Sequence, residues 1–197
     1  SLRAARTGEG HPTGGAFLSL ADGMEQLVTT LVERLPEFAI RRDTPVVDLR
    51  GPSPYLLQAP EARTVSARAV ILASPAHATA RFVTNLDTRL SELCAAIPYR
   101  STATVLLGYQ ASAVRRPMSG SGFVVSRSRR DVPLIAGSWV TSKWPGRAPT
   151  GYVLLRGFLG GTHDVDALSR SDDELIEQAH ATFAKLLQIE HRPDLTR

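Results

Sequence analysis

The side chains that could do chemistry on their own are few, and their spacing forms no known site. The histidines are His11, His77, His163, His180 and His191. No two of them are spaced as metal ligands on one helix would be, which argues against a zinc or iron site. Ser74 and Ser138 do not lie in a Gly-x-Ser-x-Gly turn, so both are poor candidates for a nucleophile. We therefore expect no catalytic side chain and no metal site.

Glycine-rich segments could instead hold the phosphates of a cofactor. The segment GSGFVV at 120–125 fails the dinucleotide-binding fingerprint because its third glycine is absent, and no Walker phosphate loop occurs. Gly160-Gly161 ends a strand-like run, and the His163-Asp164 pair beyond it is more typical of a turn than of an acid and base pair. These residues supply no redox group and no acid and base pair. Any such chemistry must therefore come from a group outside this chain.

The composition predicts a soluble globular protein with no membrane-spanning segment in this chain. The chain has 197 residues, of which 43% are hydrophobic, so it can bury a core. No apolar run reaches the roughly 20 residues of a membrane-spanning helix, and the first residues lack the apolar segment of a signal peptide. We expect a cytoplasmic location. Cys94 is the only cysteine, which excludes an internal disulfide.

The net charge of +4 comes almost wholly from arginine, because Lys143 and Lys185 are the only lysines. Arginine forks match carboxylates and phosphates, so the positive charge suits an anionic small molecule or a nucleic acid. The arginines are scattered, with the densest group at 127–130, and few aromatic residues lie between them. This pattern favours a solvated basic surface over a nucleic-acid partner.

The helical signals are clear. Asp22 and Glu25 have the spacing of a capping box, and Pro36 ends the segment that follows. An apolar stripe marks this first helix: Met24, Leu27, Val28, Leu31 and Leu35. A second capping box, Ser171 with Glu174, begins the last helix. Two shorter helices are predicted between them, at 76–83 after Pro75 and at 87–96.

The strand signals fall into two groups. Short runs are predicted at 38–42, 45–49, 55–59, 64–67 and 69–74. The last of these is continuously apolar, as a strand buried in a parallel sheet would be. Longer strands are predicted at 102–109, 122–126, 133–140 and 152–159. Helices and strands together indicate an α/β fold with α+β character.

The order and wording of several segments resemble the protoporphyrinogen oxidase family. They are FLSLADGMEQLVTTLVERL, TPVVDL, AVILASPAHATARFV, LSELCAAIPYRSTATVLLGY, GSGFVV and SKWPGRAPTGYVLLRGFLGG. The resemblance covers residues 17–189. It is strongest for the arginine- and alanine-rich actinobacterial type, whose members act on coproporphyrinogen III rather than protoporphyrinogen IX.

The resemblance implies FAD as cofactor and two domains, a doubly wound FAD-binding domain and a substrate-binding domain built on a mixed sheet. We expect residues 1–16 to be a tail or cut end, 17–85 to be part of the FAD-binding domain, and 86–197 to form the substrate-binding domain. The family's pyrophosphate-binding Gly-x-Gly-x-x-Gly does not occur here. The chain is therefore expected to be an internal fragment that is inactive alone.

The resemblance also implies positions near the cofactor. Val46 corresponds to a valine whose backbone touches the adenosine end of the flavin, although an ordinary strand residue is an equally simple interpretation. Ala73, Ser74 and Pro75 resemble the family's Ala-Thr-Pro at a strand end close to the cofactor, with serine in place of threonine.

For the substrate, the resemblance implies that Val124, Ser138 and Phe158 surround a tetrapyrrole, with the Phe158 ring against one pyrrole. The alternative is plain sheet core. Arg147 or Arg156 could pair with propionates, or could be simple surface charges.

The implied reaction is a step of haem biosynthesis. A porphyrinogen is oxidised to the porphyrin in three two-electron steps, with molecular oxygen as the final acceptor. Two alternatives stay open. One is another member of the same superfamily, such as an amine oxidase or a carotenoid desaturase. The other is a module that binds an anionic ligand without catalysis.

Overall fold

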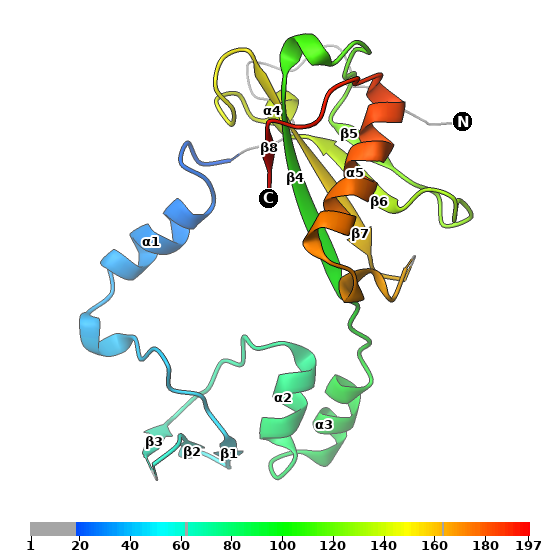
Figure 1. Ribbon diagram of the computed structural model, residues 1–197. Helices are drawn as coiled ribbons and strands as arrows, with labels where there is room; N and C mark the ends of the chain where they lie inside the picture. The colour runs from blue at the N-terminus through cyan, green and yellow to red at the C-terminus, as the bar shows by residue number, and fades with distance from the viewer. Residues whose placement is uncertain (1–18, 62, 163) are drawn as a thin grey trace, which may run out of the picture. The chain divides into compact units, whose positions relative to one another are not determined.

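A computed structural model describes residues 19–61, 63–162 and 164–197 (Figure 1). The chain divides into two compact units. The sheet unit consists of Ser1–Val28 and Arg100–Arg197, and the small unit consists of Thr29–Tyr99. The small unit thus extends past residue 85 and includes the second of the two short helices. That these units serve as FAD-binding and substrate-binding domains stays a prediction.

The sheet unit is built on five antiparallel strands in the order β5-β6-β7-β4-β8. Their bounds are β4 Thr102–Gln110, β5 Gly122–Val124, β6 Leu134–Trp139, β7 Tyr152–Gly160 and β8 Leu195–Thr196. The four longer strands expected from the sequence are all present. After β7 the chain turns away at Gly160 and Gly161, whose φ angles of 91° and 67° suit glycine.

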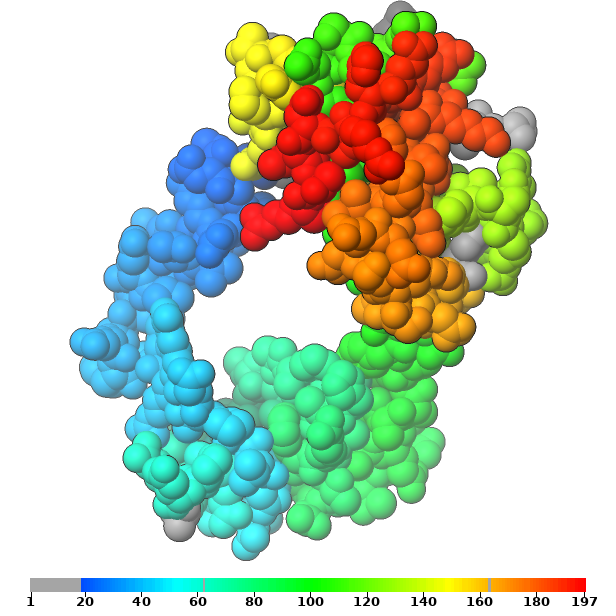
Figure 2. Space-filling view, viewed as in Figure 1, coloured from blue at the N-terminus to red at the C-terminus, as the bar shows by residue number. Residues whose placement is uncertain are grey.

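One helix, α5 at Asp172–Leu187, covers one face of this sheet (Figures 1 and 2). Its predicted capping box is confirmed: the Glu174 N–H donates to the Ser171 hydroxyl, and the Ser171 N–H donates to the Glu174 carboxylate at 2.8 Å. Its buried face comprises Leu175, Ala179, Phe183 and Leu187. Shorter helical segments of the sheet unit are α4 Val140–Lys143, η2 Ala111–Ala113 and η3 Ala167–Ser169.

The centre of α5 rests on two glycines that face each other across neighbouring strands, Gly137 of β6 and Gly157 of β7. A Cβ atom at Gly137 would lie 2.9 Å from Cε1 of Phe183 and closer still to the ring of Phe123. A Cβ atom at Gly157 would lie 3.0 Å from Cδ2 of Leu134 and 3.3 Å from Cε2 of Phe183. The absence of side chains at this pair lets the Phe183 ring approach the backbone of the sheet.

Three aromatic rings, those of Phe123, Trp139 and Phe183, meet at this contact. The ring centroids of Phe123 and Trp139 lie 5.6 Å apart, and those of Trp139 and Phe183 lie 6.0 Å apart. The indole N–H of Trp139 donates to the backbone oxygen of Ser119 at 3.2 Å, so the buried indole keeps a hydrogen bond. This cluster ties β5, β6 and α5 together.

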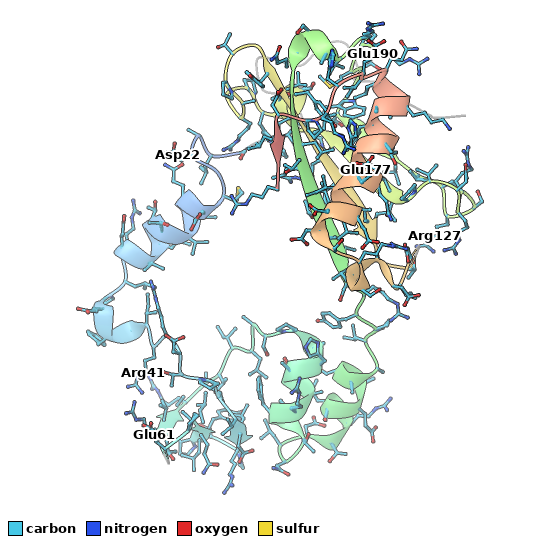
Figure 3. All side chains as sticks on the ribbon, in the orientation of Figure 1. Asp22, Arg41, Glu61, Arg127, Glu177 and Glu190 are labelled. Carbon is cyan, nitrogen blue, oxygen red and sulfur yellow. The ribbon has the colours of Figure 1, made fainter. Side chains whose placement is uncertain are left out.

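A polar pair ties α5 to β4. The buried hydroxyl of Tyr109 lies 2.9 Å from Nδ1 of His180. Burial raises the pKa of the Tyr109 phenol, and the negative charge of Glu177 raises it further. Burial also lowers the pKa of His180, Glu177 opposes this shift, and Arg192 adds to it. Glu177, which Figure 3 labels on α5, forms an ion pair with Arg192.

The first predicted helix is present as α1, Glu25–Glu33. It begins later than an Asp22 cap would require, because a turn precedes it in which the Gly23 N–H donates to the Leu20 oxygen. The predicted stripe does not pack within the described residues. Its members are all exposed: Met24, Leu27, Val28, Leu31 and Leu35.

The small unit combines a three-stranded antiparallel sheet, in the order β1-β2-β3, with two helices. The bounds are β1 Asp48–Arg50, β2 Tyr55–Gln58, β3 Thr64–Ala67, α2 Ala76–Val83 and α3 Thr88–Ala95. Both predicted helices are confirmed. Pro75 precedes α2, and the Asp87 carboxylate caps α3 by accepting from the Leu90 N–H at 2.9 Å.

Two strand predictions in the small unit are wrong. Residues 38–42 do not form a strand; the 3-10 helix η1, Glu37–Ala39, lies there. Residues 69–74 also form no strand, and Ile71 is 92% exposed. A parallel strand needs hydrogen-bonding neighbours on its edges. No described strand pairs with 69–74, so its apolar pattern alone does not produce one.

We expect Gly137→Ala to lower the thermal midpoint of the sheet unit strongly, because the new methyl group must displace Phe123 or Phe183. Overpacking of this kind costs on the order of 1–3 kcal/mol. Gly157→Ala is the matched control with a smaller expected loss, since its nearest neighbour is a flexible leucine tip. Circular dichroism melts compare the two. Equal midpoints for Gly137→Ala and the unmodified protein would contradict the close contact.

The stability of the sheet unit should also depend on the charge of His180. Its folded pKa lies below the unfolded value of about 6.5. Protonation therefore favours the unfolded state, so the stabilisation is complete above about pH 6.5 and is lost as the pH falls towards the folded pKa. We expect His180→Gln to reduce the fall in thermal midpoint between about pH 7.5 and pH 5.5. The exposed His191, changed to Gln, is the control, and an equal pH dependence in both variants would refute the role.

Candidate functional site

The face of the sheet opposite α5 carries all three residues predicted to surround a substrate. Side chains alternate along a strand, and Leu155 and Leu159 of β7 point into the core with α5. Arg156 and Phe158 therefore lie on the other face. We call this face the open face, because α5 does not cover it.

One row of residues on the open face crosses four strands in register. Val124 of β5 lies opposite Ala136 of β6, Ala136 lies opposite Phe158 of β7, and Phe158 lies opposite Thr104 of β4. Strands are spaced about 4.8 Å apart, so the row is about 14 Å long. Phe158 is partly buried, whereas Val124 is 77% exposed. The row offers a flat, largely apolar strip with a ring in it.

A second row lies beside the first, two residues along each strand. Ser138 of β6 lies opposite Arg156 of β7, and Arg156 lies opposite Leu106 of β4. Ser138 is only 7% exposed, and its hydroxyl lies 3.5 Å from the backbone oxygen of Ser121. The predicted residues Val124, Ser138 and Phe158 are thus brought together on one surface.

The two candidate arginines differ in what they contact. The guanidinium of Arg147 donates to the Ser19 hydroxyl at 2.8 Å and to the Leu20 oxygen at 2.6 Å. It therefore fixes the segment that precedes α1. Arg156 has a buried Nε with no hydrogen-bond partner among the described residues. Of the two, Arg156 is the one available for a ligand.

The small unit holds an apolar hollow of about 260 Å³. It is lined by Val46, Leu49, Leu57, Val70, Ile71, Leu72, Ala73, Ser74 and Phe82. Three of the four residues predicted to lie near a cofactor, Val46, Ala73 and Ser74, therefore share one wall. Because hydrophobic side chains surround the space, it suits a flat apolar group rather than a hydrated ion.

A side-chain hydrogen bond stabilises one side of this hollow. The hydroxyls of Ser74 and Thr79 lie 2.9 Å apart, which ties the loop to the first turn of α2. The fourth predicted residue, Pro75, is the N-cap of α2 and does not line the hollow. The first N–H group of the helix, from Ala76, donates to the Tyr99 hydroxyl at 2.7 Å.

A second hollow of about 540 Å³ adjoins the first and shares Val46 and Leu57 with it. It is basic, since Arg41, Arg42 and Arg63 line it (Figure 3 labels Arg41). The small unit thus joins an apolar wall to an arginine-rich one, an arrangement suited to a ligand with one flat and one anionic part.

Sequence reasoning missed several residues of both places. Leu49, Leu57 and Phe82 line the apolar hollow, and Thr104 and Ala136 complete the row on the open face. Phe82 lies in α2, and the other four lie in strands, whose period-two alternation was the signal that could have found them. Alternation can place a residue on a face of its strand, but it does not say which strands are neighbours.

In residues 19–61, 63–162 and 164–197, no three histidine, cysteine, aspartate or glutamate side chains are grouped as metal ligands. No helix in the same ranges has both the length and the hydrophobicity needed to cross a membrane.

Known proteins share this sequence pattern. Residues 3–196 match the model of a family described as flavin containing amine oxidoreductase. The coproporphyrinogen III oxidase of Bacillus subtilis (strain 168) is 31% identical over 183 residues, which cover 92% of this chain and 38% of that protein. The chloroplastic protoporphyrinogen oxidase of Oryza sativa subsp. japonica is 25% identical over 130 residues, covering 63% of this chain and 24% of that protein. The chain spans well under half the length of these relatives.

Solved structures share the fold. A protein from Exiguobacterium sp. 255-15, provisionally called a protoporphyrinogen oxidase, superposes with a TM-score of 0.74 at 26% identity, over 93% of this chain and 39% of that one. Cyclohexylamine oxidase from Brevibacterium oxydans superposes with a TM-score of 0.70 at 19% identity, over 89% of this chain and 38% of that one. The second likeness concerns the fold alone.

Proposed function

Because the chain belongs to the family of flavin-containing amine oxidoreductases, we propose that it is the middle part of an FAD-dependent porphyrinogen oxidase of haem biosynthesis. Family membership makes FAD the cofactor and oxidation–reduction the reaction class. The substrate proposed is coproporphyrinogen III, with protoporphyrinogen IX as the less favoured choice. The observation that carries this proposal is the open face, where an apolar row lies beside Arg156, whose buried Nε has no hydrogen-bond partner among the described residues.

The apolar hollow of the small unit fits part of the cofactor. Val46, Ala73 and Ser74 line it, and its volume and apolar wall suit a flat ring of the adenosine end. In the proposal, the backbone at Val46 and the loop held by Ser74 and Thr79 position this end. When bound, FAD supplies the two-electron acceptor for the oxidation, and molecular oxygen takes the electrons from it.

The open face supplies the substrate wall. Phe158 lies in the middle of the four-strand row, so a pyrrole ring could stack on it while Val124 and Thr104 lie under the two ends of the macrocycle. The buried Ser138 adds one polar atom beside Ala136 and leaves more room than a large apolar residue would. These residues bind and orient the substrate and exclude water. None of them transfers a proton in the proposed role.

The choice of substrate is supported by the relatives. The Bacillus subtilis protein and a 29% identical protein of Propionibacterium freudenreichii, which matches 94% of this chain, are both named coproporphyrinogen III oxidases. The plant relatives, named protoporphyrinogen oxidases, match a smaller share of it.

The direct test is an assay of the full-length protein with coproporphyrinogen III and protoporphyrinogen IX, followed by porphyrin fluorescence. We expect oxidation of both, with the larger kcat/KM for coproporphyrinogen III. Primary amines serve as the comparison substrates. A protein that oxidises amines and neither porphyrinogen would contradict the proposal, and equal kcat/KM values would overturn only the substrate preference.

Replacing Phe158 with alanine should weaken catalysis without loss of the flavin. The stacking surface is lost, so KM should rise by roughly tenfold, as for removal of about 1–2 kcal/mol of aromatic contact. Flavin absorbance should stay unchanged. Phe38→Ala is the matched control, because Phe38 is 84% exposed and lies in the small unit. If Phe158→Ala and Phe38→Ala behave alike, the stacking role is wrong.

A further inference from the structure

Arg156 is the charged side chain in the two rows of the open face, and within the part of the chain that the structure describes it lacks a hydrogen bond at its buried nitrogen. Its Nε atom is buried and has no hydrogen-bond partner among the described residues. A buried N–H of a cation without a partner costs more than an ordinary unpaired amide, because the charge loses its hydration. We therefore expect the guanidinium of Arg156 to have a hydrogen-bond acceptor in the functional, ligand-bound state.

The neighbours of Arg156 on this face cannot provide that pairing. Ser138 and Leu106 lie directly opposite it, and Leu154 and Phe158 precede and follow it on the same side of β7. None of these four side chains carries a negative charge. Four other arginines of the sheet unit form ion pairs with carboxylates: Arg115, Arg129, Arg170 and Arg192.

The position of Arg156 relative to Phe158 indicates which chemical group its partner should be. Residues two apart on a strand lie about 7 Å from each other on the same face. A flat ring stacked on Phe158 would therefore place a carboxylate on its edge within reach of the arginine fork. Planar guanidinium groups favour carboxylates because two parallel hydrogen bonds can form.

We propose that Arg156 binds a peripheral carboxylate of the macrocycle and thereby selects for the more highly carboxylated porphyrinogen. This inference rests on the proposed function and adds a specificity-determining residue to it. Ser138 and Leu106 are the cross-strand neighbours of Arg156, and its Nε is shielded from water, which strengthens an ion pair there over one on an open surface. The alternative partner of Arg156 is a carboxylate elsewhere in the full-length protein. The experiment below distinguishes this alternative from a carboxylate of the substrate.

The experiment compares the full-length protein with its variants Arg156→Gln and Arg156→Lys. Arg127→Gln is the control for the change in charge, since Arg127 is exposed in the loop between β5 and β6 (Figure 3). Two quantities are measured at about pH 7.5, where carboxylates are ionised. They are KM and kcat for both porphyrinogens, and Kd for coproporphyrin III and for its tetramethyl ester by fluorescence.

We expect Arg156→Gln to raise KM for coproporphyrinogen III and Kd for coproporphyrin III by roughly tenfold or more, as for loss of a charged hydrogen bond. KM for protoporphyrinogen IX should rise less, and kcat should change little, because the pair is present before and during the reaction. Arg156→Lys should recover part of the loss. The ester should bind the unmodified protein and Arg156→Gln equally.

Other results would overturn the inference. Equal losses of acid and ester binding in Arg156→Gln would mean that Arg156 pairs with the protein itself. If the variant does not fold, the unmodified protein still decides, because equal affinity for the acid and the ester would exclude a bound carboxylate. Oxidation of a porphyrinogen with no effect of Arg156→Gln would reject this inference alone, whereas no oxidation of either porphyrinogen would reject the proposed function with it.

Discussion

The contact between Phe183 and the paired glycines Gly137 and Gly157 determines the architecture of the sheet unit. It brings α5 close enough to the strands to bury the centre of one face. Because side chains alternate along every strand, burying one face also decides which residues are left on the other. Phe158 and Arg156, which are two residues apart on β7, are thus left together on the open face.

The open face that results is suited to binding rather than to acid–base chemistry. It carries a ring, small and apolar residues and one arginine, and it carries no histidine or carboxylate in either row. A flavoprotein can work with such a surface, because the cofactor performs the redox reaction and the protein needs only to hold and orient the substrate. The small unit complements it with an apolar hollow next to an arginine-lined one.

Local signals predicted much of the fold. The capping box of α5, the Pro75 start of α2 and the four predicted strands of the five-stranded sheet are confirmed. Two of the failures have a common cause. The 69–74 segment and the stripe of α1 both carry the apolar pattern of buried elements, yet no described residues cover them. A pattern states that a surface should be buried, and the partner that buries it lies elsewhere in the sequence or outside this chain.

The sequence by itself determined the type and order of the elements and, through wording shared across several segments, the family. Only the tertiary structure decided that Val124 and Phe158 lie in one row and that Val46 and Ala73 share a hollow. It also decided that Arg147 is hydrogen-bonded, whereas the buried Nε of Arg156 has no partner in the part of the chain that the structure describes. The physical reason is range. Helix caps and strand alternation depend on residues a few positions apart, whereas strand register and the pairing of a charge depend on residues brought together from distant parts of the chain.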